Sequence, residues 1–474
     1  MKLNFIKFLT ILALTLPIFY TSAQTTNFEV TGWVPYWRSK EGIESILPHL
    51  DKFTEVNPFV YTVRLDGTLF QNSDLSNVEW TNLRTRANEK KVRFIPTVMW
   101  ANPDAIDDVL KNPEKRQAHV RSITAEVYKN NFHGIDIDYE AKYARTKPYF
   151  SLFLKELKEA IGYDKWIMCT IEARTPLDAR FSSTETIPTD IEFANDFSEI
   201  NRYCDRVRIM AYDQGRIDLK LNEANSHPYI PVADSLWVEK VVRLAMAEIS
   251  KDKILIGVPT YGYEYDMFTS LSGSGQTEYS RLWSFNPGFA SSHAQTLNLT
   301  PSRNSAGELF LIYPAKDSPD PVIPLPFATR VMSWSDAEAI RQKAELAKKL
   351  GVRGISLFRI DGGQDQALWD VLSKYPSIKD GKKPPAFVLE TSTSIIPASD
   401  LSFGAKGEDV RALQKLLNER GFAVATSGPG SPGNETTIFG SATRSALIRF
   451  QKDRGITPAA GYYGRITRAA FQSR

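Results

Sequence analysis

Eight short apolar runs, most of them followed by a segment of helical periodicity, occupy the chain before residue 380. Each run is rich in β-branched or aromatic residues, which is typical of strands. Strands that alternate with helices form parallel sheets, and eight such units close a TIM (β/α)8 barrel. The runs are 28–37, 56–63, 92–100, 134–140, 166–172, 206–212, 254–261 and 354–360. The sequence therefore predicts an α/β fold with a barrel at 26–377.

Two connections in this region are distinctive. A helix is predicted at 335–350, where Ala337, Ile340 and Ala344 lie on one stripe and Gly351 follows as a stop. The connection 262–331, between the seventh and eighth runs, is rich in Ser, Gly, Pro and aromatic residues. It is too long for a simple loop in a compact domain, so we expect a small inserted α+β lobe that flanks a cleft.

The composition changes after the barrel. Residues 378–400 contain Lys-Lys-Pro-Pro and Thr-Ser-Thr-Ser without apolar periodicity, which predicts a linker. The segment 401–474 then contains a short internal repeat, and each Thr in it could cap a helix. The repeated units are Leu413-Gln414 with Phe450-Gln451, and Phe439-Gly440 and Thr443 with Tyr463-Gly464 and Thr467. We expect a small all-α module.

The first residues have the pattern of a secretory signal. Lys2 and Lys7 precede an apolar run, and Thr21-Ser22-Ala23 provides small residues at a cleavage site. The alternative, a membrane anchor, needs ~20 apolar residues, and Pro17 and Thr21 interrupt the run sooner. We predict a signal peptide at 1–23 and no stable membrane insertion. The protein is expected to be secreted, either extracellular or associated with the cell wall, or periplasmic if the cell has an outer membrane.

Composition argues against several classes of function. The formal net charge of +3 is too near zero to indicate nucleic acid. The scattered His and Cys residues predict neither a transition-metal site nor any other cofactor. Cys169 and Cys204 lie in or beside neighbouring strands, and for them we expect buried free thiols, with a disulfide as the alternative.

Three acids alternate along the fourth strand. Asp136, Asp138 and Glu140 point to one face of the strand, which in a barrel is the interior. Unpaired buried carboxylates cost several kcal/mol or take up a proton, so stability alone does not explain them. Glu140 is the last of the three and reaches the carboxyl-terminal rim, where barrel active sites lie.

Three interpretations compete for these acids. A hard-metal site would need ligands from other loops, and no second acid cluster at a strand end is evident. A solvated strand face is compatible with Ile135 and Ile137. In the third interpretation, Asp138 raises the pKa of Glu140 and keeps it protonated as a general acid.

This strand resembles the Asp-x-x-Asp-x-Asp-x-Glu signature of glycoside hydrolase family 18, the chitinase and endo-N-acetylglucosaminidase family. One position departs from it, because His133 stands where the first acid is expected. That position precedes the catalytic face, so the expected consequence is structural. The lectin-like members of the family lack the final Glu, which is present here as Glu140.

The resemblance continues at Met210-Ala211-Tyr212-Asp213, which is similar to the family's Met-x-Tyr-Asp. It implies a retaining reaction in which the substrate's own 2-acetamido oxygen attacks the anomeric carbon and forms an oxazolinium ion. By this resemblance Glu140 is the general acid and then the base, and Asp138 orients the acetamido group. Asp136 controls the proton balance of Asp138, Tyr212 binds the acetamido oxygen, and Asp213 contacts the sugar.

Further residues are candidates for substrate binding. Met210 belongs to the same motif, and Tyr261 ends the seventh strand, whose sequence resembles the bacterial branch that includes spore cortex-lytic glucosaminidases. Phe358 stands where the family usually has a Trp under the −1 sugar and offers a smaller stacking surface. Trp37 and Trp100 end the first and third strands, either as sugar platforms or as packing residues.

The segment 401–474 looks like the small helical peptidoglycan-binding domain found beside many wall hydrolases. It carries eleven Lys and Arg against five Asp and Glu, a surplus that would favour an anionic wall. Peptidoglycan is therefore the expected substrate and the cell wall the expected partner, with chitin as the alternative polymer. A catalytically weak carbohydrate-binding protein is the alternative from another class. A monomer is expected.

Overall fold

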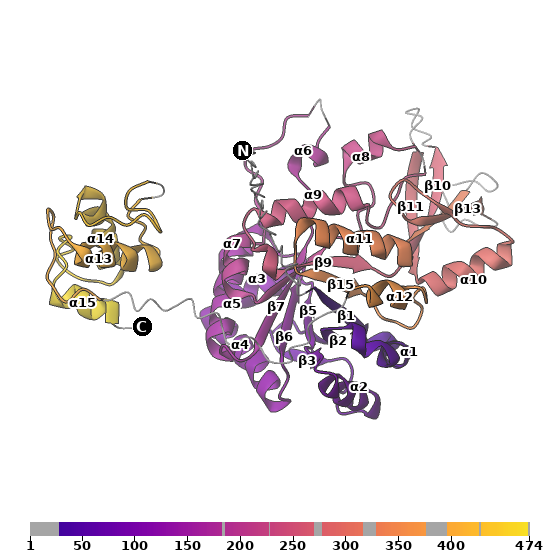
Figure 1. The fold of residues 1–474 in the computed structure, drawn as a ribbon, viewed down its shortest axis with the longest axis horizontal. Coiled ribbons are helices and arrows are strands. Elements are labelled where there is room, and N and C mark those ends of the chain that lie inside the picture. Colours follow the sequence, from indigo (N-terminus) through magenta and orange to yellow (C-terminus); the bar gives the residue numbers. More distant parts are fainter. Residues whose placement is uncertain are drawn as a thin grey trace, which may run out of the picture. The chain divides into compact units, whose positions relative to one another are not determined.

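The computed structural model describes residues 28–182, 185–226, 228–269, 277–315, 329–375, 396–425 and 428–472 (Figure 1). These fall into two compact units, residues 28–375 and 396–472. The predicted signal peptide and residues 378–395 of the predicted linker lie outside the described residues. Within the described ranges, no helix has the length and apolar character needed to cross a membrane.

The first unit is a closed barrel of parallel strands, as predicted. Closure is complete because β1 pairs with β2 on one side and with β15 on the other. The third predicted strand is divided into β4 and β5 at Pro96, which has no N–H to donate to a ladder. The barrel strands are β1 (Glu29–Pro35), β2 (Glu55–Val63), β4 (Arg93–Phe94) with β5 (Thr97–Trp100), β6 (Gly134–Tyr139), β7 (Trp166–Glu172), β8 (Arg206–Met210), β9 (Ile254–Pro259) and β15 (Gly354–Phe358).

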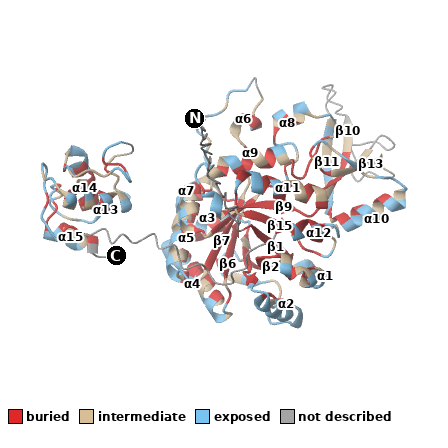
Figure 2. Cartoon of the chain, viewed as in Figure 1, coloured by how far each residue is buried: buried red, intermediate tan, exposed pale blue. Residues whose placement is uncertain are grey.

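Helices surround the barrel and cover its outer face. The predicted helix α11 (Ala337–Leu350) begins at Asp336, whose side chain accepts the N–H of Ala339, and ends at Gly351 in the left-handed region with φ 67°. The other outer helices are α1 (Ser39–Ile46), α2 (Val78–Glu89), α3 (Pro103–Lys111), α4 (Pro113–Lys129), α5 (Lys147–Ile161), α7 (Phe197–Tyr203), α9 (Ser235–Met246) and α12 (Leu368–Ser373). Figure 2 shows the strands almost wholly buried inside this ring.

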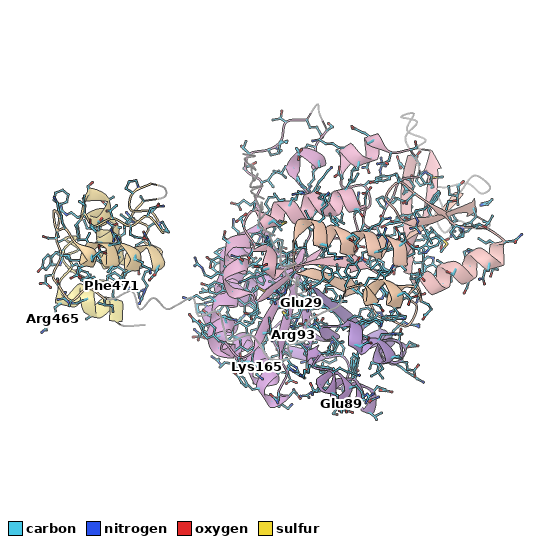
Figure 3. The ribbon with its side chains drawn as sticks, viewed as in Figure 1. Glu29, Glu89, Arg93, Lys165, Arg465 and Phe471 are labelled. Atoms are coloured by element: carbon cyan, nitrogen blue, oxygen red, sulfur yellow. A yellow bond between two sulfur atoms is a disulfide. The ribbon has the colours of Figure 1, made fainter. Side chains whose placement is uncertain are left out.

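Charged side chains fill the barrel interior near the amino-terminal ends of the strands. Arg93 pairs with Glu29 at 2.7 Å and with Glu55 at 2.9 Å, and Figure 3 labels Glu29 and Arg93 near the strands. Arg208 pairs with Glu55 and, at 2.8 Å, with Asp136. Burial favours the protonated form of Glu29, but Arg93 and two further arginines outweigh it and lower its pKa. A ladder of paired charges therefore connects the first strand to the acids of β6.

The inserted lobe follows β9 and is antiparallel. Its sheet runs in the order β11-β10-β14-β13-β12, and one helix packs on it. A small core of its own includes Phe285, Leu311 and Trp334. Its elements are β10 (Gly262–Thr269), β11 (Thr277–Phe285), α10 (Pro287–Leu297), β12 (Ser302–Arg303), β13 (Leu309–Pro314) and β14 (Thr329–Trp334). The prediction of an α+β lobe between the seventh and eighth barrel strands is confirmed for the described part.

The prediction of free thiols is wrong, because Cys169 and Cys204 form a disulfide. Cys169 lies within β7 and Cys204 follows α7, immediately before β8. β7 and β8 are neighbours in the sheet, and the two Cα atoms are 5.9 Å apart, which is within the range that a disulfide requires.

The second unit is helical, with α13 (Glu408–Glu419), α14 (Ser441–Asp453) and α15 (Arg465–Gln472). Gln414 donates to Thr443 Oγ1 at 2.8 Å and accepts the N–H of Thr436. Gln451 repeats this arrangement with Thr467 at 2.9 Å and with the N–H of Gly461. The internal repeat is thus a repeat of buried hydrogen bonds. Thr443 does not cap a helix as predicted, because Gly440 occupies the N-cap position of α14 and the Thr443 hydroxyl accepts a hydrogen bond from Gln414.

The disulfide closes a loop with a sequence separation of 35, so its loss should lower the free energy of unfolding by about 4 kcal/mol. We expect this loss in the double variant Cys169→Ala/Cys204→Ala, measured by urea unfolding against the oxidised protein. Reduced wild type is the matched control, since it lacks the bond but keeps the side-chain volume. Equal stability of the reduced and oxidised proteins would contradict the prediction.

Candidate active site

β6 carries the first two of the three acids into the barrel, and Asp136 is the most firmly held. Its carboxylate accepts hydrogen bonds from Thr97 at 2.8 Å, Thr170 at 2.9 Å and the indole of Trp33 at 3.2 Å. The ion pair with Arg208 completes its surroundings. A fully buried carboxylate with this many donors is held in one position.

Asp138 lies two residues further along β6, nearer the carboxyl-terminal rim of the barrel, and has a different environment. It is 3% exposed, and its Oδ1 has no hydrogen-bond partner within the described part of the chain. Burial raises its pKa well above the usual range, and the negative charges of Glu140, Asp136 and Glu172 add to the effect. Burial and these charges therefore favour the protonated form of Asp138.

Glu140 directly follows β6, at the carboxyl-terminal rim. Its N–H donates to the carbonyl oxygen of Trp100 at 2.8 Å, which holds the end of β6 against β5. Burial raises the pKa of Glu140, the charges of Glu172 and then Asp213 raise it further, and Lys142 opposes them. The expected interaction with Asp138 is present as well, because Asp138 and Glu140 repel each other and Glu140 raises the pKa of Asp138. Glu172 is a further carboxylate that raises the pKa of Glu140.

Sequence reasoning missed Glu172 and Lys142. Glu172 is the last residue of β7, and its Oε1 accepts the N–H of Ala141, which has φ 56°, at 2.8 Å. Lys142 Nζ lies 3.5 Å from Glu172 Oε2, and despite burial its charge lowers the pKa of Glu172. The signal that could have found Glu172 is its position, since it ends a barrel strand at the same rim as Glu140.

Aromatic side chains line the interior opposite the acids. Tyr212 stacks on Phe358 with ring centroids 5.6 Å apart and an angle of 15° between planes, and Tyr261 meets both rings edge-on. A Cβ at Gly257 would lie 2.9 Å from the Tyr212 ring, so glycine leaves the space that this ring occupies. Burial raises the pKa of Tyr212 well above its usual value, which keeps its hydroxyl protonated as a donor. The peptide bond between Phe358 and Arg359 is cis.

Asp213 follows Tyr212 at the rim with φ 58°. Its Oδ1 accepts hydrogen bonds from Tyr261 at 2.5 Å and from Tyr263 at 2.9 Å, so the inserted lobe begins at a residue that touches the site. Met210 is half-buried at the end of β8. The structure therefore brings Met210, Tyr212, Asp213 and Tyr261 to the rim that holds Glu140, although only their positions, and not their roles, follow from it.

The two candidate tryptophans differ in exposure. Trp37 is 45% exposed and packs edge-on against Phe59, so one part of its ring remains open. Trp100 is 2% exposed and packs against His119 and Tyr139, which places its ring in the core, the packing role considered as its alternative. His133 lies at the opposite end of β6, where its Nδ1 accepts the N–H of Phe94 at 3.1 Å.

Two hollows flank the rim around β6. One of about 650 Å3 lies at the ends of β2 and β5, and one of about 270 Å3 lies at the end of β7. Among the described residues, no group of three or more His, Cys, Asp or Glu side chains is arranged to hold a metal ion. The arrangement offers a carboxyl group with a raised pKa at the rim, a second one beneath it and phenol donors nearby, which suits proton transfer to a bound polymer.

Comparison with known proteins identifies the family. Residues 30–363 match the family described as Glycosyl hydrolases family 18, over more than half of the chain. The chain belongs to glycoside hydrolase family 18. Residues 406–471 match a peptidoglycan binding domain. The protein is thus a glycoside hydrolase with a second, wall-related module.

Individual relatives are distant. YvbX of Bacillus subtilis (strain 168), an uncharacterized glycosylase, is 22% identical over 334 residues, 68% of this chain and 87% of YvbX. The spore cortex-lytic enzyme SleL of Bacillus cereus has a TM-score of 0.58 and 17% identity, covering 74% of this chain and 75% of SleL. A chitinase from Chromobacterium violaceum ATCC 12472 has a TM-score of 0.55 and 18% identity, covering 73% of this chain and 98% of the chitinase. The two solved structures share the fold.

The charges around Glu140 predict opposite pH shifts for two substitutions. Glu172→Gln removes an anion that raises the pKa of Glu140, so the basic limb of the kcat/KM profile should move to lower pH by about one unit. Lys142→Met removes the opposing cation, so the limb should move to higher pH. The profile of each variant on a soluble N-acetylglucosamine oligomer tests this, with thermal melting to verify folding.

The matched control is Lys155→Gln, a surface cation on α5. It should leave the limb in place. Shifts of the same sign in Glu172→Gln and Lys142→Met would show that folding, and not the local charges, controls the profile.

Proposed function

We propose that this protein is a secreted, retaining hydrolase of β-1,4 bonds in peptidoglycan and that it uses the substrate's acetamido group as nucleophile. The observation that carries the mechanism is Asp138, buried beneath Glu140 among acidic neighbours that favour its protonated form. A protonated carboxyl group is a poor nucleophile, but its carbonyl oxygen can accept the N–H of an acetamido group and orient that group.

Glu140 is then the proton donor to the glycosidic oxygen. Its raised pKa favours the protonated carboxyl group, as a general acid requires. Tyr212 donates to the acetamido oxygen, and Asp136, fixed as an anion by Arg208, stabilises the proton on Asp138. After the first product leaves, the Glu140 carboxylate accepts a proton from the water that opens the oxazolinium ring.

The second module supports peptidoglycan as the polymer. A wall-binding unit joined to a hydrolase raises the local concentration of the enzyme on an insoluble substrate. The basic surplus of residues 401–474 favours an anionic wall by long-range attraction. Chitin remains the alternative substrate because it carries the same 2-acetamido group. The protein would act outside the cytoplasm and as a monomer.

Glu140→Gln removes the transferable proton at nearly constant shape, so hydrolysis should fall by at least a hundredfold while the polymer still binds. The measurement is the release of reducing ends from purified peptidoglycan and from chitin by wild type and variant. Activity of the wild type on chitin alone would remove peptidoglycan as the substrate. No activity on either polymer would favour a carbohydrate-binding protein.

The stereochemistry of the product tests the mechanism separately. Participation of the acetamido group predicts that the first product formed from a soluble oligomer has the β configuration, observable by NMR before mutarotation. A first product in the α configuration would show direct attack by water and exclude the oxazolinium route.

A further inference from the structure

A pocket of about 270 Å3 lies at the end of β7, beside the residues that act on Glu140. Lys142 and Glu172 form one wall. Glu172 raises the pKa of Glu140, and Lys142 lowers it. The other walls come from the segment after β7 and from the segment before α7. The residues of these walls that matter here are Arg174, Arg180, Glu192, Phe193, Asn195 and Phe197.

Arg174 is positioned firmly and keeps donors free. Its guanidinium carbon lies 4.0 Å from the ring centroids of both Phe193 and Phe197, and its Nη2 donates to the carbonyl oxygen of Asn195 at 2.8 Å. No carboxylate of the described residues lies within ion-pair distance of it. Arg180 is exposed and also has no ion pair in the ranges that the structure describes. Asp196 and Glu248 act on Arg174 from beyond ion-pair distance, so two guanidinium groups line the pocket without a carboxylate in direct contact.

The remaining polar groups of the pocket are consistent with an anionic ligand that also has N–H groups. Glu172 pairs with Lys142, and its Oε2 accepts a hydrogen bond from Asn195 Nδ2 at 2.8 Å. Its negative charge is therefore balanced by a cation of the same wall. Glu192 contributes an exposed carboxylate, leaving two guanidinium groups against one acid. Asn195 is 9% exposed, and its Oδ1 has no partner within the described residues. It can accept an N–H from a ligand.

The position beside Glu140 indicates which part of a substrate reaches this pocket. Glu140 protonates the oxygen on C4 of the leaving sugar, so the substituent on the neighbouring C3 lies next to that proton transfer. In chitin this substituent is a hydroxyl group. In muramic acid it is a lactyl ether, extended in the wall by a peptide with amide N–H groups and carboxylates.

We propose that this pocket binds the anionic lactyl-peptide substituent of a muramic acid in the leaving position. The inference rests on the proposed function and deepens it, because it names the group that distinguishes peptidoglycan from chitin. Arg174 and Arg180 bind the carboxylates, and Asn195 accepts an amide N–H. The bond that is cut is then the one that joins N-acetylglucosamine to C4 of muramic acid.

The test compares three soluble tetrasaccharides with the full-length protein. One alternates N-acetylglucosamine with muramic acid and carries the peptides, the second has lost the peptides and keeps the lactyl carboxylates, and the third is the N-acetylglucosamine tetramer. The variants are Arg174→Gln and Arg180→Gln. The matched control is Arg121→Gln, an exposed arginine on α4.

Arg174→Gln should lower kcat/KM on the peptide-bearing substrate about tenfold more than on the N-acetylglucosamine tetramer, and Arg180→Gln about threefold more. Arg121→Gln should show no such difference. Removal of the peptide sets the lactyl carboxylate free, so a selective loss that persists on the stripped substrate shows that a carboxylate at this position is sufficient as a ligand. A selective loss confined to the peptide-bearing substrate assigns the ligand to the peptide carboxylates. Equal effects on all three substrates would overturn the proposal.

Binding measurements distinguish a wrong assignment of the pocket from a wrong assignment of the hydrolase function. In the Glu140→Gln background, calorimetry with the same three oligomers should show the same selective weakening by the two arginine substitutions. If wild type cuts none of the oligomers but the weakening is observed, the pocket stands and the hydrolase function is wrong. If the weakening is not observed, the pocket assignment is wrong even for an active enzyme. Because Arg180 is exposed, its substitution remains informative should Arg174→Gln fold poorly.

Discussion

The ion pair between Arg208 and Asp136 is the contact on which the site depends. Both side chains are fully buried, and neither could remain charged there alone. The pair is stable because Arg208 also binds Glu55, which binds Arg93, which binds Glu29. Each charge in the barrel interior thus compensates the next. The strands that contribute these residues must keep their register, since a shift by one residue would turn the side chains outward.

This ladder explains why neighbouring acids of one strand behave differently. Asp136 receives several donors and a cation, whereas Asp138 lies nearer the rim, where burial and three negative neighbours outweigh the charge of Lys142. Glu140 is nearer to solvent and is influenced by the Glu172 and Lys142 pair. A single alternating pattern therefore places three carboxyl groups at three depths, and depth together with the nearest charge decides which of them holds a proton.

Much of the barrel could be predicted from sequence because its strands are apolar and β-branched and its helices have clear periodicity. The position of Glu140 followed from alternation along one strand. The disulfide, the partner of Asp136 and the influence of Glu172 could not be predicted, because each joins different strands and depends on their register. Trp100 illustrates the same limit, since its place at a strand end did not reveal that His119 and Tyr139 would enclose it.

In the second unit, the residues that stabilise the fold differ from the surface residues that a partner could contact, and the duplicated glutamines belong to the first group. Gln414 and Gln451 are 1% and 2% exposed, and each fixes a turn from inside. Asn418 fixes the 428–434 loop in the same manner, through the carbonyl oxygen of Gly430. Because the two glutamines are buried, the outer residues of their turns are free to diverge. Related modules could therefore come to bind different wall polymers through substitutions at surface positions alone, each of which leaves the fold stable.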